Sequence, residues 1–476
     1  MIRWGMIPNR RELAMATFFR KPDRRQRLLL PVDMLDWLPE TDFVHLVLDA
    51  VDGMDLSGFE AEYRTGGAGQ APFAPAMMLA VLIYAYANGH RSSRKVERLC
   101  WRDVGFRMIV GDHVPDHSVI ARFRRRHAER VQAVFVAVLR LCRAAGLGRL
   151  GVVALDGTKV AANAALAANR TAQTIDQEVA AILAEAEATD AAEDAIHGEL
   201  RGDELPAELR RREDRLARLI AAKERLARAA AERAAAQQAK VDARAAEEAA
   251  TGQHKRGRKP TPPSAEVDPQ AKANPTDPDS GIMKTAKGWV QGYNAQAMVT
   301  EDQIIIAEAL TQDANDVQQL DPMVTAALVN LEIVSGEEVE LGAVLADAGY
   351  WSEANAETET AEAELLIATR KDHRQQAARR DLPPPRGRMP NNLTPRQRMD
   401  RKLLTQRGRD LYRRRGQTIE PVFGQMKETQ GAGRLMVRGR TACAGEWTLH
   451  CVAHNLKKLH AHRVRRAANG RRPALH

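Results

Sequence analysis

Aromatic side chains, cysteines and long apolar stretches are all scarce in this sequence. Aromatic residues make up 4% of the 476 residues, whereas hydrophobic residues as a whole make up 44%, which is typical of a helix-rich protein built on Ala and Leu. The four cysteines, Cys100, Cys142, Cys443 and Cys451, show no Cys-x-x-Cys spacing. We therefore expect small buried thiols in a reducing compartment and no disulfide framework.

The longest apolar run, residues 74–87, is shorter than the roughly 20 residues that a membrane-spanning helix needs. It is better interpreted as a buried helix. Residues 1–21 lack the apolar segment of a secretory signal. We therefore expect no membrane partner and a cytoplasmic protein.

Positive charge is unevenly distributed along the chain. Lys and Arg number 71 against 62 Asp and Glu, for a net charge of +9 and a pI near 9.5, and this balance favours a polyanionic partner. Residues 370–415 hold 16 basic and four acidic residues, a local net charge of +12. This tract is either a solvated loop, as charge blocks often are, or a contact surface for phosphates.

Apolar periodicity predicts an all-helical front, followed by a region in which strands and helices alternate. Residues 152–155 form a short β-branched run, 289–299 and 304–310 predict a hairpin, and apolar strands follow at 341–346 and 365–370. A helix is expected between the hairpin and the next strand. This order predicts a mixed α/β sheet with helices on its faces.

A long helical stretch interrupts the strands. Residues 172–250 are rich in Ala, Glu and Arg, with leucines at three- and seven-residue steps, so we expect a helical hairpin or a short coiled coil. A Pro-rich segment follows and predicts a flexible linker. The predicted segments are an N-terminal extension 1–29, a helical domain 30–148, a mixed α/β domain 149–171 plus 283–465, an inserted helical hairpin 172–250, a flexible linker 251–282 and a basic tail 466–476.

Two acidic residues follow apolar strands directly. Asp156 comes after the run at 152–155, and Asp347 comes after the run at 341–346. Each aspartate precedes glycine closely and is therefore also a candidate turn residue. Open α/β sheets nevertheless place their chemistry at the carboxyl ends of strands. The pair is therefore a candidate for half of a reaction centre.

A third acid lies beyond the basic tract. Glu420, Phe423 and Lys427 are spaced to share one face of a helix. Pro421 is poorly tolerated inside a helix, so we expect the helix to begin near Thr418 or to kink at the proline. Glu420 is then close to a helix start, where the helix dipole would also favour an ordinary surface acid.

These motifs together resemble a bacterial insertion-sequence transposase of the DDE class. The matching pieces are LDGTKV at 155–160, VLADAGYWS at 344–352, Tyr412-x2-Arg415 and Glu420-x6-Lys427. The helical front, with PDHSVIARFRRRH, is similar to the N-terminal domain of the same subgroup. The family usually places three residues between its arginine and glutamate, whereas four separate Arg415 from Glu420 here. The resemblance implies that 149–171 plus 283–465 is a ribonuclease H-like catalytic domain with a helical insertion after its first strand. It also implies that 30–148 is a DNA-binding and assembly domain, and that the protein is associated with the nucleoid.

The resemblance also implies a chemistry. Asp156, Asp347 and Glu420 would bind two divalent cations, Mg²⁺ or Mn²⁺, which suit hard oxygen ligands and phosphodiester displacement. Arg415 and Lys427 would hold DNA phosphates, and Tyr412 would contact the backbone or align a phosphate. The expected partners are the element's terminal inverted repeats and target DNA, both double-stranded, bound by a homodimer. The alternative is an inactive or repurposed DNA-binding protein derived from a transposase.

Further arginines are candidates for DNA contacts. One cluster lies early in a predicted helix of the front, a second lies in RGRKP, which resembles arms that enter narrow minor grooves, and a third lies in the basic tract. Each cluster is also consistent with a solvated surface. The candidates are Arg122, Arg124, Arg125, Arg126, Arg256, Arg258, Arg413 and Arg414.

Overall fold

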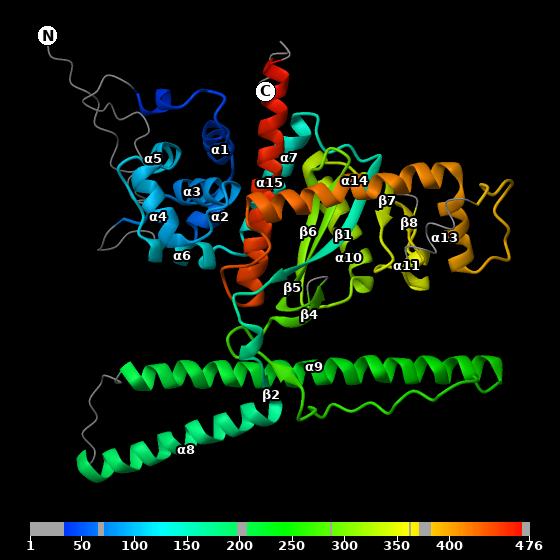
Figure 1. The fold of residues 1–476 in the computed structure, drawn as a ribbon, viewed down its shortest axis with the longest axis horizontal. Helices are drawn as coiled ribbons and strands as arrows, with labels where there is room; N and C mark the ends of the chain where they lie inside the picture. The colour runs from blue at the N-terminus through cyan, green and yellow to red at the C-terminus, as the bar shows by residue number, and fades with distance from the viewer. Residues whose placement is uncertain are drawn as a thin grey trace, which may run out of the picture. The chain divides into compact units, whose positions relative to one another are not determined.

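The computed structural model describes residues 33–64, 71–197, 207–285, 288–360, 363–370 and 382–468, with side chains omitted at 186–197 and 207–212. The chain forms two compact units (Figure 1). Unit 1 comprises Met1–Val160, Asn294–Val437 and Thr441–His476, and unit 2 comprises Ala161–Tyr293 and Arg438–Arg440. The predicted extension 1–29 and most of the tail 466–476 lie outside the described residues. The predicted domain boundaries stay predictions.

The front of unit 1 is helical, as the periodicity predicts. Its elements are the 3₁₀ helix η1 (Met34–Trp37), α1 (Phe43–Asp52), α2 (Ser57–Glu60), α3 (Pro75–Ala87), α4 (Ser93–Arg102), α5 (Val104–Val110), α6 (His117–Arg126) and α7 (Val131–Ala144). The apolar run at 74–87 is indeed a buried helix, α3, and Pro75 lies at its first position, where no N–H is needed. Asp116 caps α6 by accepting the Ser118 N–H at 2.7 Å.

A buried carboxylate fastens the helical front to the last helix, α15 (Arg440–Ala468). Glu446 of α15 is fully buried. It accepts the Tyr86 hydroxyl of α3 at 2.8 Å and the backbone N–H groups of Met436 and Val437 at 2.8 and 3.1 Å. These hydrogen bonds compensate its burial, because a buried carboxylate without partners would be strongly destabilising.

The second half of unit 1 is built around a mixed sheet, to which unit 2 contributes β4 and the beginning of β5. Its strands are β1 (Val152–Ala161), β4 (Gly281–Thr285), β5 (Gly288–Thr300), β6 (Ile305–Thr311), β7 (Leu341–Ala346) and β8 (Ala363–Ile367). The order is β4-β5-β1-β7-β8, with β6 also pairing with β5. β1, β7 and β8 are parallel, whereas β4–β5 and β5–β6 are antiparallel. The predicted hairpin is therefore confirmed, and β5 itself passes from unit 2 into unit 1.

Helices pack on this sheet. α10 (Leu320–Ser335), which follows η3 (Val317–Gln319), contacts β6; α13 (Pro395–Leu404) contacts β8, and α14 (Gln406–Thr429) contacts β7. The short α11 (Glu353–Glu357) contacts α13. Figure 1 shows α14 crossing the strands. Leu403, Leu411 and Tyr412 cover a core of buried strand residues that includes Val152 and Leu345.

Unit 2 carries two long helices, α8 (Ala172–His197) and α9 (Ala207–Thr251), where the sequence predicts an inserted helical hairpin. The 3₁₀ helix η2 (Leu166–Ala168) and the small sheet of β2 (Arg170–Thr171) and β3 (Lys272–Ala273) lie beside them. Ile175, Leu219 and Leu226 form the buried contact between the helices. α9 is the longest green helix in Figure 1.

The segment after α9 differs from the expected flexible linker. It runs back along α9 and is held there by hydrogen bonds. Arg244 donates to the Arg258 carbonyl at 3.0 Å, and Gln237 donates to the Thr261 carbonyl at 2.8 Å. The pKa of Glu248 is lowered to about 2, first by its hydrogen bond from Arg244. Composition suggested mobility because it does not reveal these tertiary contacts.

The remaining composition-based expectations can be checked within the described residues. All four cysteines are free and buried, as expected. None of the helices described there is both long enough and apolar enough to cross a membrane.

Candidate active site

Strand register brings two of the predicted acids together. β1 and β7 are parallel neighbours, and their last paired residues are Leu155 and Ala346. Asp156 and Asp347 follow directly, so they lie side by side where β7 ends. β1 continues to Ala161, which shows that the alternative of a turn residue at Asp156 is wrong. The strand prediction was too short because its apolar signal ends at Leu155.

Asp156 is held from two sides. Its Oδ1 accepts the Gly157 N–H at 2.8 Å, and its Oδ2 lies 3.0 Å from Nη1 of Arg415. Burial raises the pKa of Asp156 to about 6; the Arg415 guanidinium opposes this increase and the Asp347 carboxylate adds to it. The strand therefore presents a carboxylate whose negative charge is incompletely compensated.

Asp347 begins a tight turn after β7. Its Oδ1 accepts the Gly349 N–H at 2.7 Å, and its carbonyl accepts the Tyr350 N–H at 3.2 Å. Tyr350 is fully buried, and its hydroxyl donates to Oε1 of Gln296 on β5. These bonds fix the loop that carries Asp347.

Helix α14 brings three predicted site residues to the strands. The Tyr412 hydroxyl donates to the Ala346 carbonyl at 3.3 Å, directly before Asp347. Arg415 pairs with Asp156, and Nζ of Lys427 donates to the Thr158 hydroxyl on β1. Burial lowers the pKa of Lys427, and the nearby Asp156 carboxylate opposes that change. The predicted Tyr412, Arg415 and Lys427 therefore lie at the aspartates.

Pro421 lies inside a continuous helix. α14 runs from Gln406 to Thr429, so the prediction of a helix start near Thr418 is wrong, and Glu420 lies in the middle of the helix. A proline leaves the carbonyl four residues earlier without its helical donor. That carbonyl belongs to Gln417, and Nε2 of Gln303 donates to it at 3.4 Å. A tertiary contact thus compensates the proline.

Glu420 is exposed and stands apart from the aspartate pair. Among the described residues, the carboxylates of Glu420, Asp156 and Asp347 do not form a group whose ligating atoms all lie within 4.8 Å of one another. It lies on α14 between Arg415 and Lys427, both of which contact β1. The structure therefore joins two of the three predicted acids and places the third on the adjoining helix.

The residues at the strand ends fit a divalent cation. Carboxylate oxygens are the donors that Mg²⁺ and Mn²⁺ prefer, and Asp156 and Asp347 present them together. The Asn294 Oδ1 is buried and has no hydrogen-bond partner. A Cβ atom added at Gly157 would lie 3.0 Å from that oxygen. Two carboxylates and, on the opposite face of β1, one buried amide oxygen without a partner therefore lie close to this part of the strand.

The predicted DNA-contact arginines of α6 divide into two kinds. Arg122 and Arg125 are exposed. Arg124 instead donates to the Tyr86 hydroxyl at 2.8 Å and to the Arg91 carbonyl at 3.0 Å. Arg126 pairs with Glu62 at 3.1 Å and lies over the Tyr63 ring. Because the Arg124 guanidinium bonds within the protein, it is poorly placed for a phosphate.

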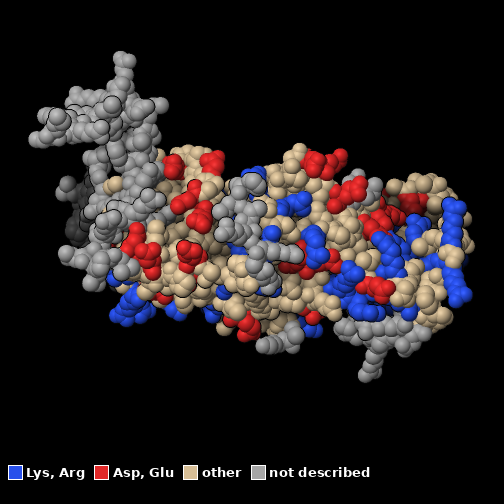
Figure 2. Space-filling view, turned by 90° about the horizontal axis from the view of Figure 1, so that it is seen from above, with Lys and Arg blue, Asp and Glu red and all other residues tan. Residues whose placement is uncertain are grey.

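The other candidates lie on exposed segments. Arg256 and Arg258 are exposed beside α9, and Arg413 of α14 is 74% exposed. Arg414 pairs with Glu301 at 2.7 Å. Figure 2 shows Lys and Arg side chains gathered at the end where α13 and the beginning of α14 lie. Residues 371–381 of the basic tract lie outside the described residues.

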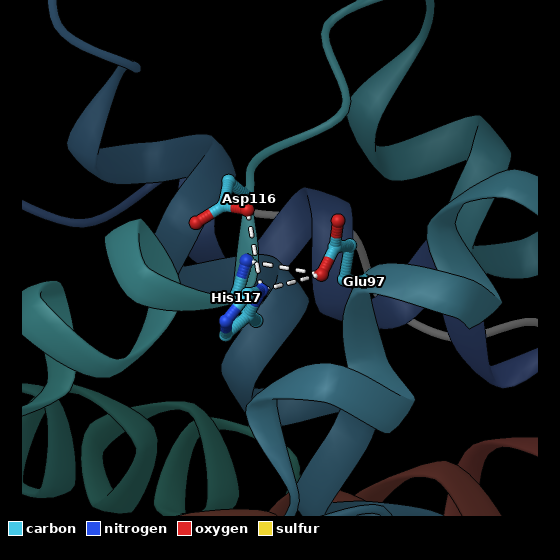
Figure 3. Close-up of side chains that lie close together, drawn as sticks. All are labelled: Glu97, Asp116 and His117. Carbon is cyan, nitrogen blue, oxygen red and sulfur yellow. Dashed lines mark hydrogen bonds and ion pairs between the residues drawn. The ribbon is translucent and has the colours of Figure 1, made fainter.

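A second acidic group, which the sequence analysis did not identify, lies in the helical front. Glu97 of α4 faces Asp116 and His117 at the start of α6 (Figure 3). Their ligating atoms lie within 4.8 Å of one another. The His117 Nδ1 is 2.9 Å from Glu97 and 3.2 Å from Asp116. The hollow beside them, about 350 Å³ in volume, is also lined by Arg94, Arg98 and Trp101.

Sequence reasoning also missed Asp316. Its carboxylate lies 3.4 Å from Nζ of Lys159 on β1 and accepts hydrogen bonds from Asn294 and Gln296 of β5. The one available signal was an acid just before a predicted helix, which suggests only a cap. His454 and Asn455 of α15 are buried and bond to the backbone of Gln303 and Ile305, which is the behaviour of packing residues.

Two family matches bear on identity. Residues 32–126 match the family described as Transposase domain (DUF772), and residues 388–460 match the family described as Transposase DDE domain. The second match includes Tyr412, Arg415, Glu420 and Lys427. No curated protein and no solved structure matches the chain. The helical front and the α13–α15 region thus each match a transposase domain family, and together these matches support an insertion-sequence DDE transposase.

Proposed function

We propose that this transposase cleaves DNA at the ends of its insertion sequence and joins the freed ends to target DNA. The reaction is metal-dependent hydrolysis of a phosphodiester followed by transesterification. One observation carries the proposal: the register of β1 and β7 sets Asp156 beside Asp347, within reach of Arg415. The family matches support a transposase role and DNA binding. A ribonuclease H-like fold for the catalytic part is included in this proposal.

Three carboxylates supply the ligands. Asp156, Asp347 and Glu420 would hold two Mg²⁺ or Mn²⁺ ions, which when bound activate a nucleophile and stabilise the leaving oxygen. Glu420 belongs to the same helix as Arg415 and Lys427, the two cations that contact β1. The ligand set is thus divided among strand β1, the loop after β7 and helix α14.

The other side chains orient the substrate. Arg415 balances the charge of Asp156 and has further N–H donors for a DNA phosphate. Lys427 brings a second positive charge to Thr158, and Tyr412 fixes the β7 end through the Ala346 carbonyl. In the first step water displaces the 3′-oxygen from phosphorus. In the second step the freed 3′-hydroxyl displaces an oxygen of the target strand.

DNA binding is proposed for the exposed arginines. Arg122, Arg125 and Arg413 are free to reach phosphates, and Arg256 and Arg258 form an exposed basic arm beside α9. Phosphate contacts of this kind position DNA without reading its sequence. A homodimer joining two element ends remains part of the proposal.

The test replaces Glu420, the predicted acid that lies on α14 and not beside the two aspartates. Glu420→Gln should abolish Mg²⁺-dependent cleavage of DNA carrying the inverted repeats that flank the gene, and DNA binding should persist. Glu428→Gln, an exposed acid on the same helix, is the matched control and should cleave normally. Cleavage by Glu420→Gln at the wild-type rate would remove Glu420 from the centre. A wild-type protein that binds the repeats but never cleaves them would favour the inactive alternative.

A further inference from the structure

The two faces of β1 make different contacts at Asp156. Side chains alternate across a strand, and Asp156 and Thr158 contact α14 through Arg415 and Lys427. Gly157 and Lys159 point to the opposite face. The contacts on that face are made by Asp316, just before η3, and by two residues of β5.

The Oδ1 of Asp316 gathers three donors from these two strands. Nδ2 of Asn294 lies at 2.6 Å, Nε2 of Gln296 at 2.9 Å and Nζ of Lys159 at 3.4 Å. Asn294 and Gln296 are fully buried. A charged acceptor makes stronger hydrogen bonds than a neutral one, so this carboxylate ties β1 to β5.

Two glycines, each one or two residues after a predicted aspartate, show how closely Asp316 approaches the backbone there. A Cβ atom at Gly157, next to Asp156, would lie 2.6 Å from the Asp316 Oδ1. A Cβ atom at Gly349, two residues after Asp347, would lie 2.9 Å from the Asp347 Oδ1 and 3.3 Å from the Asp316 Oδ2. A larger residue at either glycine would keep the backbone of β1 or of the loop after β7 farther from Asp316.

Tyr350, three residues after Asp347, is fully buried, and its backbone N–H donates to the Asp347 carbonyl at 3.2 Å. Its hydroxyl bonds to Gln296, which also donates to Asp316.

We propose that Asp316 is a positioning residue for the catalytic centre, which holds the β1 end and the Asp347 loop in place from the face opposite Asp156. The proposal rests on the proposed function. It assigns Lys159 to this support rather than to DNA. The orientation of Asp156 then depends on a carboxylate that touches neither the substrate nor a reacting atom.

The experiment compares Asp316→Ala and Asp316→Asn with Asp313→Ala. Asp313 belongs to the same loop, but its carboxylate bonds to Thr311 and Gln319 and not to β1. Two quantities are measured well below the melting temperature: cleavage of duplex carrying the element end as a function of Mg²⁺ concentration, and direct Mn²⁺ binding by the full-length protein.

Asp316→Ala should slow cleavage about 10²-fold, since small displacements of a reacting group have effects of this size. It should also raise the half-saturating Mg²⁺ concentration, weaken Mn²⁺ binding and leave DNA affinity unchanged. Asp316→Asn keeps an oxygen acceptor and loses only the charge, so its cleavage rate should fall about tenfold. Asp313→Ala should match the wild type in both measurements.

Two results would overturn the proposal. In one, Asp316→Ala binds Mn²⁺ and responds to Mg²⁺ as the wild type does. In the other, Asp316→Asn is as inactive as Asp156→Asn, which would make Asp316 a metal ligand. Absence of cleavage by the wild type would instead count against the proposed function, and Mn²⁺ binding would still decide the role of Asp316.

Discussion

Two groups of acidic side chains in this protein invite comparison: Asp156 with Asp347 at the strand ends, and Glu97 with Asp116 and His117 in the helical front. By distance alone, the second group is the better metal site, because its three ligating atoms lie within 4.8 Å of one another. The first group is divided among a strand, a loop and a helix, and its third acid, Glu420, stands apart.

Their surroundings reverse that ranking. Asp116 is occupied in capping α6, and Glu97 accepts both the backbone N–H and the ring nitrogen of His117. Arg94 and Arg98 line the same hollow and disfavour a cation. Asp156, in contrast, is partly desolvated beside another carboxylate. On this ground we propose the Asp156–Asp347 group, and not the closer group of the helical front, as the catalytic centre.

The strongest way to break this comparison is to remove one acid from each group. Asp156→Asn should lower cleavage by about 10³-fold or more, because the cations it helps hold contribute several kcal/mol to the transition state. Glu97→Gln should leave cleavage unchanged within about twofold. Both rates would be measured on element-end DNA in Mg²⁺ and again in Mn²⁺. Equal losses in the two variants would show that the helical front takes part in the chemistry.

The arginines of α14 sharpen the comparison. Arg415 is 17% exposed and bonds to Asp156, whereas Arg413 is 74% exposed and lies 3.8 Å from Asp410. Arg415→Ala should slow cleavage about tenfold to a hundredfold, the size expected for a hydrogen bond to a charged group. Arg413→Ala should slow cleavage by less than about threefold. Single-turnover rates at saturating DNA would separate this effect from binding, and a larger loss for Arg413→Ala would contradict the assignment.

Two histidines extend the comparison to pH. His117 faces two carboxylates and solvent, whereas His450 of α15 is fully buried near Arg91 and Arg124. Burial is the main cause that lowers the pKa of His450, and the positive charges of the two arginines add to it; together they bring the pKa to about 3. In the unfolded chain, His450 therefore binds a proton as the pH falls below 6.5, whereas in the folded chain it binds one only as the pH approaches 3. The contribution of His450 to the free energy of unfolding is fully present above pH 6.5 and is lost as the pH falls towards 3.

From pH 8 to pH 5 this one group should remove about 2 kcal/mol from the free energy of unfolding. His450→Gln should have a correspondingly flatter pH dependence. Urea unfolding at pH 8, 6.5 and 5 measures the difference. An unchanged slope in His450→Gln would mean that the buried imidazole does not govern acid sensitivity in this range.

Particular residues show how far the sequence predicts the structure. Asp156 and Asp347 were predictable because apolar strands end in acids, and parallel strands bring such ends together. β1 was predicted six residues too short, since its polar continuation is supported by β5 and not by its own apolar residues. Pro421 suggested a break in α14, yet Gln303 compensates the Gln417 carbonyl.

Asp316 could not be predicted for the same reason. Its donors are Lys159 of β1 and Asn294 and Gln296 of β5, and more than 130 residues of sequence lie between Lys159 and Asn294. No local spacing encodes such contacts, which arise only when β1 and β5 pair. Local pattern therefore predicts which residues begin a site, and tertiary contacts decide which residues support it.

The smallest expected effect tests the structural role given to the acidic group in the helical front. Asp116 caps α6 through the Ser118 N–H, so Asp116→Ala should lower the free energy of unfolding by about 1 kcal/mol. Asp116→Asn keeps a capping oxygen and should recover most of that loss, and cleavage should be unaffected in both variants. Thermal melting with and without Mg²⁺ is the measurement. A Mg²⁺-dependent stabilisation that disappears in Asp116→Ala but persists in Asp156→Asn would reverse the comparison, because the cation would then be bound in the helical front.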